Sequence, residues 1–98
     1  MGAPTRGRLV LSNGINVEDC NPSMVWSDDS EYLAVPQWTE DREQRLAVIS
    51  MSRRKVTYAP GKFRVLELHT FSQGKIKAVD SPIYQPREVE IVMSELKW

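Results

Sequence analysis

Apolar stretches recur every 8 to 14 positions along the chain, and short groups of turn residues separate them. Almost every stretch is rich in Val, Ile, Leu, Tyr, Phe or Trp, the residues that fit a pleated sheet best. This rhythm predicts an all-β fold, an antiparallel meander of about eight or nine short strands without a long helix. The expected strands are residues 8–12, 15–19, 23–26, 31–38, 45–50, 55–59, 62–71, 75–79 and 88–96.

Two stretches are apolar on both faces and do not alternate. They are "YLAV" at residues 32–35 and "LAVI" at residues 46–49. A strand with one face in water alternates apolar and polar residues, so a continuous apolar run indicates a strand that is covered on both sides. We therefore expect these two segments to be central strands.

The dipeptide Asn13-Gly14 lies between the first two expected strands. Asn-Gly readily adopts positive φ at both positions, as a type I′ hairpin turn requires, so we expect such a turn here. Ser72-Gln73-Gly74 is a second short reversal, in which the glycine can take a left-handed conformation.

The segment 88–96 is compatible with two structures. Its Glu, Met and Leu residues favour a helix, and it is long enough to form one. Val89 and Ile91, however, alternate with Glu88 and Glu90, which is the period of a strand with one face in water. We predict a strand over this segment.

The length of the chain predicts a single domain. A chain of 98 residues can bury one modest core, so we expect one all-β domain over residues 1–98, with residues 1–6 disordered. Lys plus Arg and Asp plus Glu both number 13, so no net field attracts nucleic acid or anionic lipid. No apolar run approaches the roughly 18 residues of a membrane span, and no secretory signal follows Met1. A cytoplasmic protein without membrane contact is the expectation.

The sequence "PSMVWSDDSEYLAV", residues 22–35, places a polar turn between two apolar strands. Asp28 and Asp29 have short side chains that can accept hydrogen bonds from backbone N–H groups one or two residues further on. Trp26 and Tyr32 can then pair at the mouth of the hairpin. We expect the two aspartates to be structural, because a pair without further converging ligands does not predict a metal site.

This segment resembles the repeat of TolB-type and WD-like β-propeller blades. Residues 26–30, Trp-Ser-Asp-Asp-Ser, stand where that family has Trp-Ser-Pro-Asp-Gly, and residues 32–35 match the apolar strand that follows. The resemblance covers residues 22–60, and Asp28 and Ser30 depart from it by replacing proline and glycine. It implies one or two propeller-blade-like sheets. Because a propeller needs about four or more blades, another copy or another protein would have to complete a ring.

Few residues could carry catalysis. His69, the only histidine, lies in an expected strand without a recognisable nucleophile motif, so we interpret it as a half-exposed structural side chain. Cys20 follows Glu18 and Asp19, which raise a thiol pKa, so we expect it to be small, buried and unreactive. The sequence lacks a phosphate-binding loop, zinc-ligand spacing and a nucleophile elbow. We predict no enzyme, no catalytic residue, no cofactor and no metal.

The densest basic group is Arg53, Arg54 and Lys55, and Lys62 and Arg64 are expected one strand away. Together with the stacking faces of Tyr58 or Phe63, residues 53–64 could bind single-stranded nucleic acid. In a chain without net charge, a solvated hairpin tip is the favoured interpretation.

Trp38 and Trp98 lie where a small sheet has little to cover them, beside the charged loop 39–44 and at the last position of the sequence. Exposed tryptophans near strand edges often mark contact surfaces. Each could equally close one end of the core.

These observations favour a non-enzymatic protein–protein interaction or assembly module that self-associates through sheet edges or faces, because open apolar edges invite pairing. The partner is then another copy of the chain or another protein. The candidate partner-binding residues are Trp38, Trp98, Arg53, Arg54, Lys55 and Tyr58. One alternative is a single-stranded nucleic-acid-binding sheet, and another is a small inhibitor or immunity-type partner protein.

Overall fold

Nine strands make up the described part of the computed structural model, which covers residues 7–21, 23–80 and 86–98. They are β1 (Gly7–Val10), β2 (Asn16–Cys20), β3 (Val25–Trp26), β4 (Tyr32–Trp38), β5 (Gln44–Ser50), β6 (Lys55–Tyr58), β7 (Leu66–Ser72), β8 (Lys75–Asp80) and β9 (Arg87–Val92). A single 3₁₀ turn, η1 (Met93–Glu95), follows β9. The predicted all-β antiparallel meander is confirmed.

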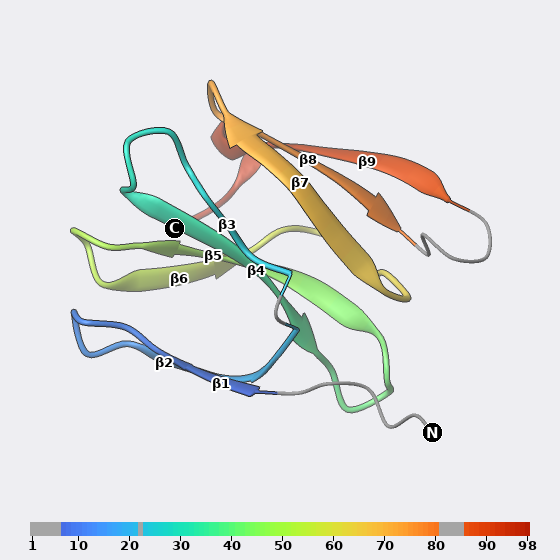
Figure 1. The fold of residues 1–98 in the computed structure, drawn as a ribbon, viewed down its shortest axis with the longest axis horizontal. Coiled ribbons are helices and arrows are strands. Elements are labelled where there is room, and N and C mark those ends of the chain that lie inside the picture. The colour runs from blue at the N-terminus through green and yellow to red at the C-terminus, as the bar shows by residue number, and fades with distance from the viewer. Residues whose placement is uncertain (1–6, 22, 81–85) are drawn as a thin grey trace.

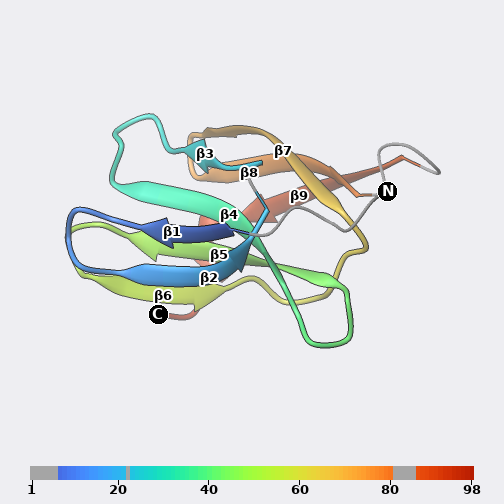
Figure 2. The same ribbon diagram turned by 60° about the horizontal axis from the view of Figure 1, so that its bottom comes forward.

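The strands form two antiparallel sheets. The larger has the order β1-β2-β4-β5-β6, with β3 also paired to β4, and the smaller has the order β7-β8-β9. In Figure 1 the β1–β2 hairpin lies below the middle strands β4, β5 and β6, and the smaller sheet lies above them. Turning the molecule brings the β1–β2 hairpin in front of β4, β5 and β6 and shows β3 beside β7 (Figure 2). The two long middle strands are therefore covered on both faces.

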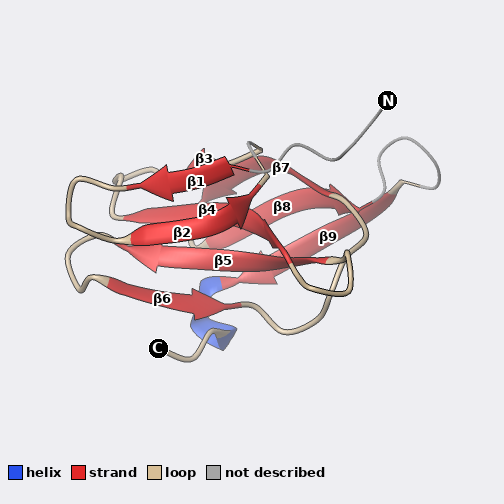
Figure 3. Cartoon of the chain, turned by 90° about the horizontal axis from the view of Figure 1, so that it is seen from below, coloured by secondary structure: helices blue, strands red, loops and turns tan. Residues whose placement is uncertain are grey.

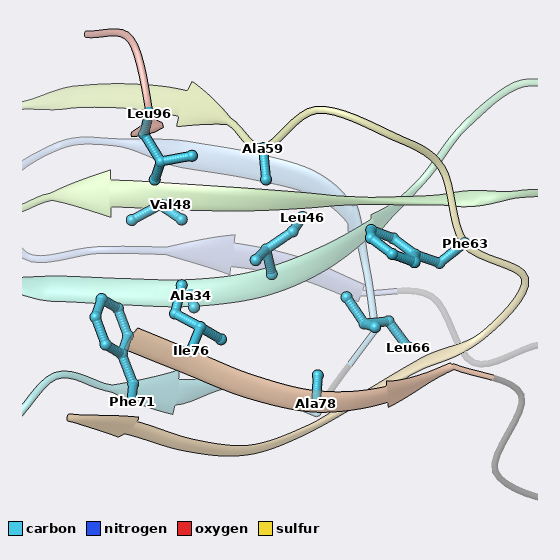
Figure 4. Close-up of a cluster of buried hydrophobic side chains, with 10 residues drawn as sticks. All are labelled: Ala34, Leu46, Val48, Ala59, Phe63, Leu66, Phe71, Ile76, Ala78 and Leu96. Atoms are coloured by element: carbon cyan, nitrogen blue, oxygen red, sulfur yellow. The ribbon is translucent and has the colours of Figure 1, made fainter. Parts of the chain in front are cut away.

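The single core expected from the chain length is wrong, because two hydrophobic cores fill the spaces between these layers. The core toward the smaller sheet, shown in Figure 4, contains Ala34, Leu46, Val48, Ala59, Phe63, Leu66, Phe71, Ile76, Ala78 and Leu96. The core under the β1–β2 hairpin contains Leu11, Val17, Cys20, Leu33, Val35, Ala47 and Ile49. Successive residues of β4 and β5 thus enter opposite cores, because side chains alternate across a strand. The prediction that residues 32–35 and 46–49 are buried on both faces is confirmed.

Buried polar groups join the two sheets where the chain passes from one to the other. The backbone of Gln44 exchanges two hydrogen bonds with Phe63, at 2.6 and 2.7 Å. The side-chain Oε1 of Gln44 accepts a further bond from the Leu66 N–H at 2.6 Å. Asp80 accepts bonds from the N–H groups of Arg64 and Val65 at 3.0 and 3.3 Å. These bonds satisfy backbone groups that no strand partner reaches.

The prediction of a type I′ turn at Asn13-Gly14 is wrong. Gly14 has φ +93°, but Asn13 does not have positive φ. The Gly14 N–H donates to the Leu11 carbonyl at 3.0 Å, and the Leu11 N–H donates to the Ile15 carbonyl at 2.9 Å. This is a three-residue loop, a type I turn followed by a left-handed glycine. Asn13 Nδ2 also bonds the Met51 carbonyl at 3.0 Å, a tertiary contact that dipeptide preference does not include.

The turn with positive φ at both central positions lies between β7 and β8. Gln73 has φ +52° and Gly74 φ +74°, and the flanking Ser72 and Lys75 are paired. A two-residue loop with this geometry is a type I′ turn. The expected reversal at residues 72–74 is therefore confirmed, with glycine in a left-handed conformation.

Two predicted strands extend four residues beyond the observed ones. The strand expected over 88–96 ends at Val92, and the chain then makes η1, with the Leu96 N–H bonded to the Met93 carbonyl at 3.1 Å. This turn places Leu96 in the core, where an extended chain would carry it onward along the sheet edge. The strand expected over 62–71 begins only at Leu66, because Asp80 takes the N–H groups of the two preceding residues.

The predicted disorder of residues 1–6 lies outside the described residues. Within the described ranges, no helix has the length and apolar character needed to cross a membrane.

Candidate functional site

The polar turn between β3 and β4 is held by its own side chains. The Ser30 N–H bonds the Ser27 carbonyl at 3.0 Å, and Ser30 has φ +59°. Asp29 Oδ1 accepts the Ser27 hydroxyl at 2.7 Å and the Glu31 N–H at 3.1 Å. These bonds lower the pKa of Asp29, the hydroxyl contributing most. The structural role predicted for Asp29 is confirmed, and its carboxylate is ionised at neutral pH.

Asp28 reaches a different part of the molecule. Its Oδ2 accepts a hydrogen bond from the Gln73 N–H at 3.3 Å, in the β7–β8 turn of the smaller sheet. The β3–β4 turn and the β7–β8 turn therefore lie side by side at one end of the molecule (Figure 1).

Glu31 connects the same end to the β5–β6 turn. Its Oε2 accepts bonds from the Ser50 hydroxyl at 2.8 Å, the Ser52 hydroxyl at 2.7 Å and the Ser52 N–H at 3.0 Å. These donors lower the pKa of Glu31, with the Ser52 hydroxyl the largest cause. Three turns that are distant in sequence are thus fixed relative to one another.

Three aromatic side chains meet between these turns. The Tyr32 ring stacks on Phe71, with centroids 6.4 Å apart, and it lies 5.8 Å from the tilted ring of Trp98. The expected pairing of Tyr32 with Trp26 is not the arrangement found. Trp26 sits opposite Leu33, on the other face of the sheet, and is 43% exposed. A one-residue difference in strand position places a side chain on the opposite face.

A cleft of about 580 Å³ opens at this end of the molecule, and we call it the mouth cleft. Four segments line it: the β3–β4 turn with Tyr32, the β5–β6 turn, the end of β7 with the following turn, and η1 with the residues after it. The lining residues are Ser27, Asp28, Asp29, Tyr32, Arg53, Phe71, Ser72, Gln73, Gly74, Met93, Ser94, Leu96 and Trp98. Its volume lies within the range of ligand-binding clefts, and its lining combines apolar side chains with a similar amount of polar surface.

The charged groups of the mouth cleft are Asp28, Asp29 and Arg53. The guanidinium carbon of Arg53 lies 5.9 Å from the centroid of the Trp98 ring. Two carboxylates and one guanidinium give the lining a net charge of −1. The aromatic wall therefore carries a negative rim with one cation over its outermost ring.

Two of the predicted contact residues, Arg53 and Trp98, are brought together in this cleft. Arg54 and Lys55 follow Arg53 at the tip of the β5–β6 hairpin and at the start of β6, where both are exposed. Tyr58 is 41% exposed at the other end of β6, and the Arg45 guanidinium lies 3.8 Å from the centroid of its ring.

The wider basic cluster expected over residues 53–64 is not one surface. Lys62 lies beyond the far end of β6 and bonds Asp41 at 2.8 Å, which lowers the pKa of Asp41 to about 2. Lys55 pairs with Ser50 at the opposite end of the same hairpin. Phe63, a proposed stacking ring, is buried in the core and 8% exposed.

Trp38 lies at the end of β4 opposite to Tyr32, about 20 Å away at the usual rise of a strand. It is half-buried and pairs with Gln44 across the β4–β5 hairpin. It therefore takes no part in the mouth cleft.

Cys20 and His69 have the environments expected from the sequence. Cys20 is buried in the core under the β1–β2 hairpin, and burial is the main cause that raises the pKa of its thiol. His69 is exposed in β7 with its Nε2 3.0 Å from Glu67 Oε1. The register of β7 and β8 shifts between Leu68 and Thr70, so His69 lies in a bulge. Across residues 7–21, 23–80 and 86–98, no cluster of His, Cys, Asp or Glu side chains could hold a metal ion.

Comparisons with protein-family models, curated proteins and solved structures give no match for this chain.

Most residues of the mouth cleft carry no signal in the sequence that predicts a site. The sequence pattern predicts only strand positions for Phe71 and Met93 and only a turn position for Asp28, although all three line the cleft. The one sequence signal for the site was the coincidence of Trp98 and Arg53 as candidate contact residues. Their proximity depends on the η1 turn, which brings residues 96–98 back under β6 (Figure 3).

Proposed function

We propose that this chain is a non-enzymatic protein-interaction module that binds its partner at the mouth cleft. The observation that carries this proposal is the convergence of Tyr32, Phe71 and Trp98 in one cleft, with Arg53 over the outermost ring. Trp, Tyr and Arg are the residues that contribute most often to the energetic centre of protein interfaces.

The rigidity of the rim supports this role. Glu31 and Asp28 tie the three surrounding turns together through hydrogen bonds to Ser50, Ser52 and Gln73. A preformed site loses less conformational entropy on binding, so more of the contact energy appears as affinity. Trp98 remains 39% exposed and so presents apolar surface to a partner.

Photo-crosslinking tests the proposal. A photoreactive amino acid at Ser94, which lines the cleft, should give one discrete adduct in cells of the native source, and Trp98→Ala should remove it. The same amino acid at Glu40, an exposed position in the loop beyond β4, is the control. An equal adduct from Glu40, or an adduct from Ser94 that survives Trp98→Ala, would show that the cleft is not the contact surface. If the captured partner is a toxin or an enzyme, the module acts as an inhibitor or immunity-type protein.

A second candidate is self-association through sheet edges. Among the described strands, β1, β3, β6, β7 and β9 each pair on one side alone, and such edges can accept a further strand. β6 begins with exposed Lys55, whereas β9 carries exposed Glu88 and Glu90. Opposite charges would favour β6 of one copy beside β9 of the next, a head-to-tail contact that builds rings or filaments. A ring of this kind would be the assembled form that the blade resemblance implies.

Sedimentation velocity distinguishes this candidate. The sedimentation coefficient should rise with concentration for the unmodified chain and stay at the monomer value for Lys55→Glu. Adding Glu88→Lys to Lys55→Glu should restore the rise, because the pair of charges is then reversed. A monomer at every concentration would remove self-association and leave the mouth cleft untouched.

Nucleic-acid binding has less support from the geometry. Of the expected basic cluster, Arg53, Arg54 and Lys55 lie together at the tip of the β5–β6 hairpin. Phe63, which was expected to stack on bases, is buried in the core. Retention of single-stranded oligonucleotides at low salt that is lost on Arg53→Glu with Arg54→Glu would favour this alternative.

A further inference from the structure

We infer that the mouth cleft binds the side chain of a lysine on the partner protein, with the alkyl stem against the aromatic wall and the ammonium group at Asp28 and Asp29. This inference rests on the proposed function and names the chemistry that its cleft would recognise.

The wall of the cleft suits an alkyl chain that ends in a cation. Tyr32 and Trp98 present aromatic surface and Met93 extends it with an aliphatic group, while Phe71 and Leu96 lie behind them in the core. Lysine buries its methylene stem along apolar surface while keeping the ammonium group hydrated. Aromatic faces also attract cations through their quadrupole, within about 6 Å of the ring centroid.

The two carboxylates stand at the rim on one short turn. Each is oriented by a backbone contact, Asp28 through the Gln73 N–H at 3.3 Å and Asp29 through the Glu31 N–H at 3.1 Å. The bonds to Asp29 go to Oδ1, so Oδ2 is not engaged by them. A fixed pair of carboxylates offers an ammonium group hydrogen-bond acceptors and a favourable charge interaction.

Arg53 shows that this wall already accepts a cation. Its guanidinium lies over Trp98 from an exposed hairpin tip, at 5.9 Å from the ring centroid. An incoming ammonium group would meet the like charge of Arg53, so Arg53 opposes binding of the guest. Replacing Arg53 with a neutral residue should therefore increase affinity for a cation and decrease affinity for an anion.

Three small probes separate the possibilities in nuclear magnetic resonance titrations of the full chain. Butylammonium, butanol and pentanoate carry an aliphatic stem of similar length with a positive, a neutral and a negative head group. We expect butylammonium to shift the indole N–H of Trp98 and the backbone signals of residues 27–30 and 72–74 at millimolar concentrations, with most of the affinity from burial of its stem. Butanol and pentanoate should need several-fold higher concentrations, because an exposed charge interaction changes affinity by only a few-fold.

Substitutions then test the sign of each charge. Asp28→Asn and Asp29→Asn keep an oxygen in the same position and should each weaken butylammonium binding by about fivefold at low salt, the size of one charge interaction in water. Arg53→Gln should strengthen it by a similar factor. Glu40→Gln, in the distant loop, is the control and should change nothing. Unchanged signals elsewhere in each spectrum verify that the variants are folded.

Two outcomes overturn the inference. Equal binding of butanol would reduce the site to an apolar surface, and preference for pentanoate that is lost in Arg53→Gln would make it an anion site. If either result is found while the crosslink from Ser94 still depends on Trp98, the lysine site is rejected but the proposed interaction function is retained. Loss of that crosslink dependence, with butylammonium still bound at Asp28 and Asp29, would instead reject the protein-interaction function while keeping the cation site.

Discussion

The side chain of Gln44 shows how one buried polar residue holds the junction between the sheets. It is fully buried, and its Oε1 bonds the Leu66 N–H at 2.6 Å, while no hydrogen-bond partner for its Nε2 lies among the described residues. A buried polar group without a partner is destabilising, and we expect the contact with Leu66 to outweigh that cost.

Replacing Gln44 with leucine tests this balance. Gln44→Leu removes the unsatisfied nitrogen but leaves the Leu66 N–H without an acceptor, so we expect a loss of about 1–3 kcal/mol in the free energy of unfolding. Urea denaturation measures it. Gln44→Glu should be worse at neutral pH, because it buries a charge, and should recover in part as the pH falls. A leucine variant as stable as the unmodified chain would show that the contact with Leu66 is not stabilising.

Glu31 gives a prediction for pH. Because its pKa lies below the ordinary 4.5 in the folded chain, the folded state binds this proton less readily than the unfolded state does. The resulting stabilisation is complete above pH 4.5 and disappears as the pH falls through the lowered folded value. Glu31→Gln should lower the melting temperature by a few degrees at pH 7, and the difference from the unmodified chain should shrink below pH 4. Glu40→Gln, at an exposed position in the loop beyond β4, is the matched control.

At the scale of elements, the hairpin turns are where local preference and tertiary structure disagree. Ser30 occupies a left-handed conformation, φ +59°. Side chains other than glycine, asparagine and aspartate take this conformation at a cost of about 1–2 kcal/mol. The bonds of the preceding turn and the anchoring of Glu31 evidently outweigh that cost.

Ser30→Gly should therefore stabilise the protein. Glycine removes the left-handed penalty but adds freedom to the unfolded chain, so the expected net gain is about 0.5–1 kcal/mol. Thermal unfolding is the measurement. Ser12→Gly, in a loop position without positive φ, is the matched control and should be neutral or destabilising. A gain of equal size at Ser12 would mean that loop strain at Ser30 is not the cause.

The strands followed from the sequence because apolar periodicity is a local property that burial enforces. Doubly apolar runs at residues 32–35 and 46–49 correctly indicated strands between two layers. Turn types were less predictable, since Asn13 is held by the Met51 carbonyl, 38 residues away. The predicted end of β9 was wrong for a similar reason, because Leu96 leaves the sheet edge and packs in the core.

At the scale of the whole molecule, the mouth cleft could not be predicted from local patterns. Its residues come from positions 27 to 98, and their proximity depends on how the two sheets stack and on the η1 turn. The sequence indicated which side chains are suited to contacts, Trp98 and Arg53 among them. Which of these residues meet was decided by the fold, which separates Trp38 and Tyr58 from the cleft.

Chemical-shift mapping with the crosslinked partner tests the central claim most directly. As the purified partner is added to the isotopically labelled chain, we predict changes at residues 27–30, 72–74 and 93–98, around the mouth cleft. The outer edges of β6 and β9 and the Trp38 end should stay unchanged. Shifts confined to those edges, or to the Trp38 end, would contradict the assignment of the mouth cleft as the interaction site.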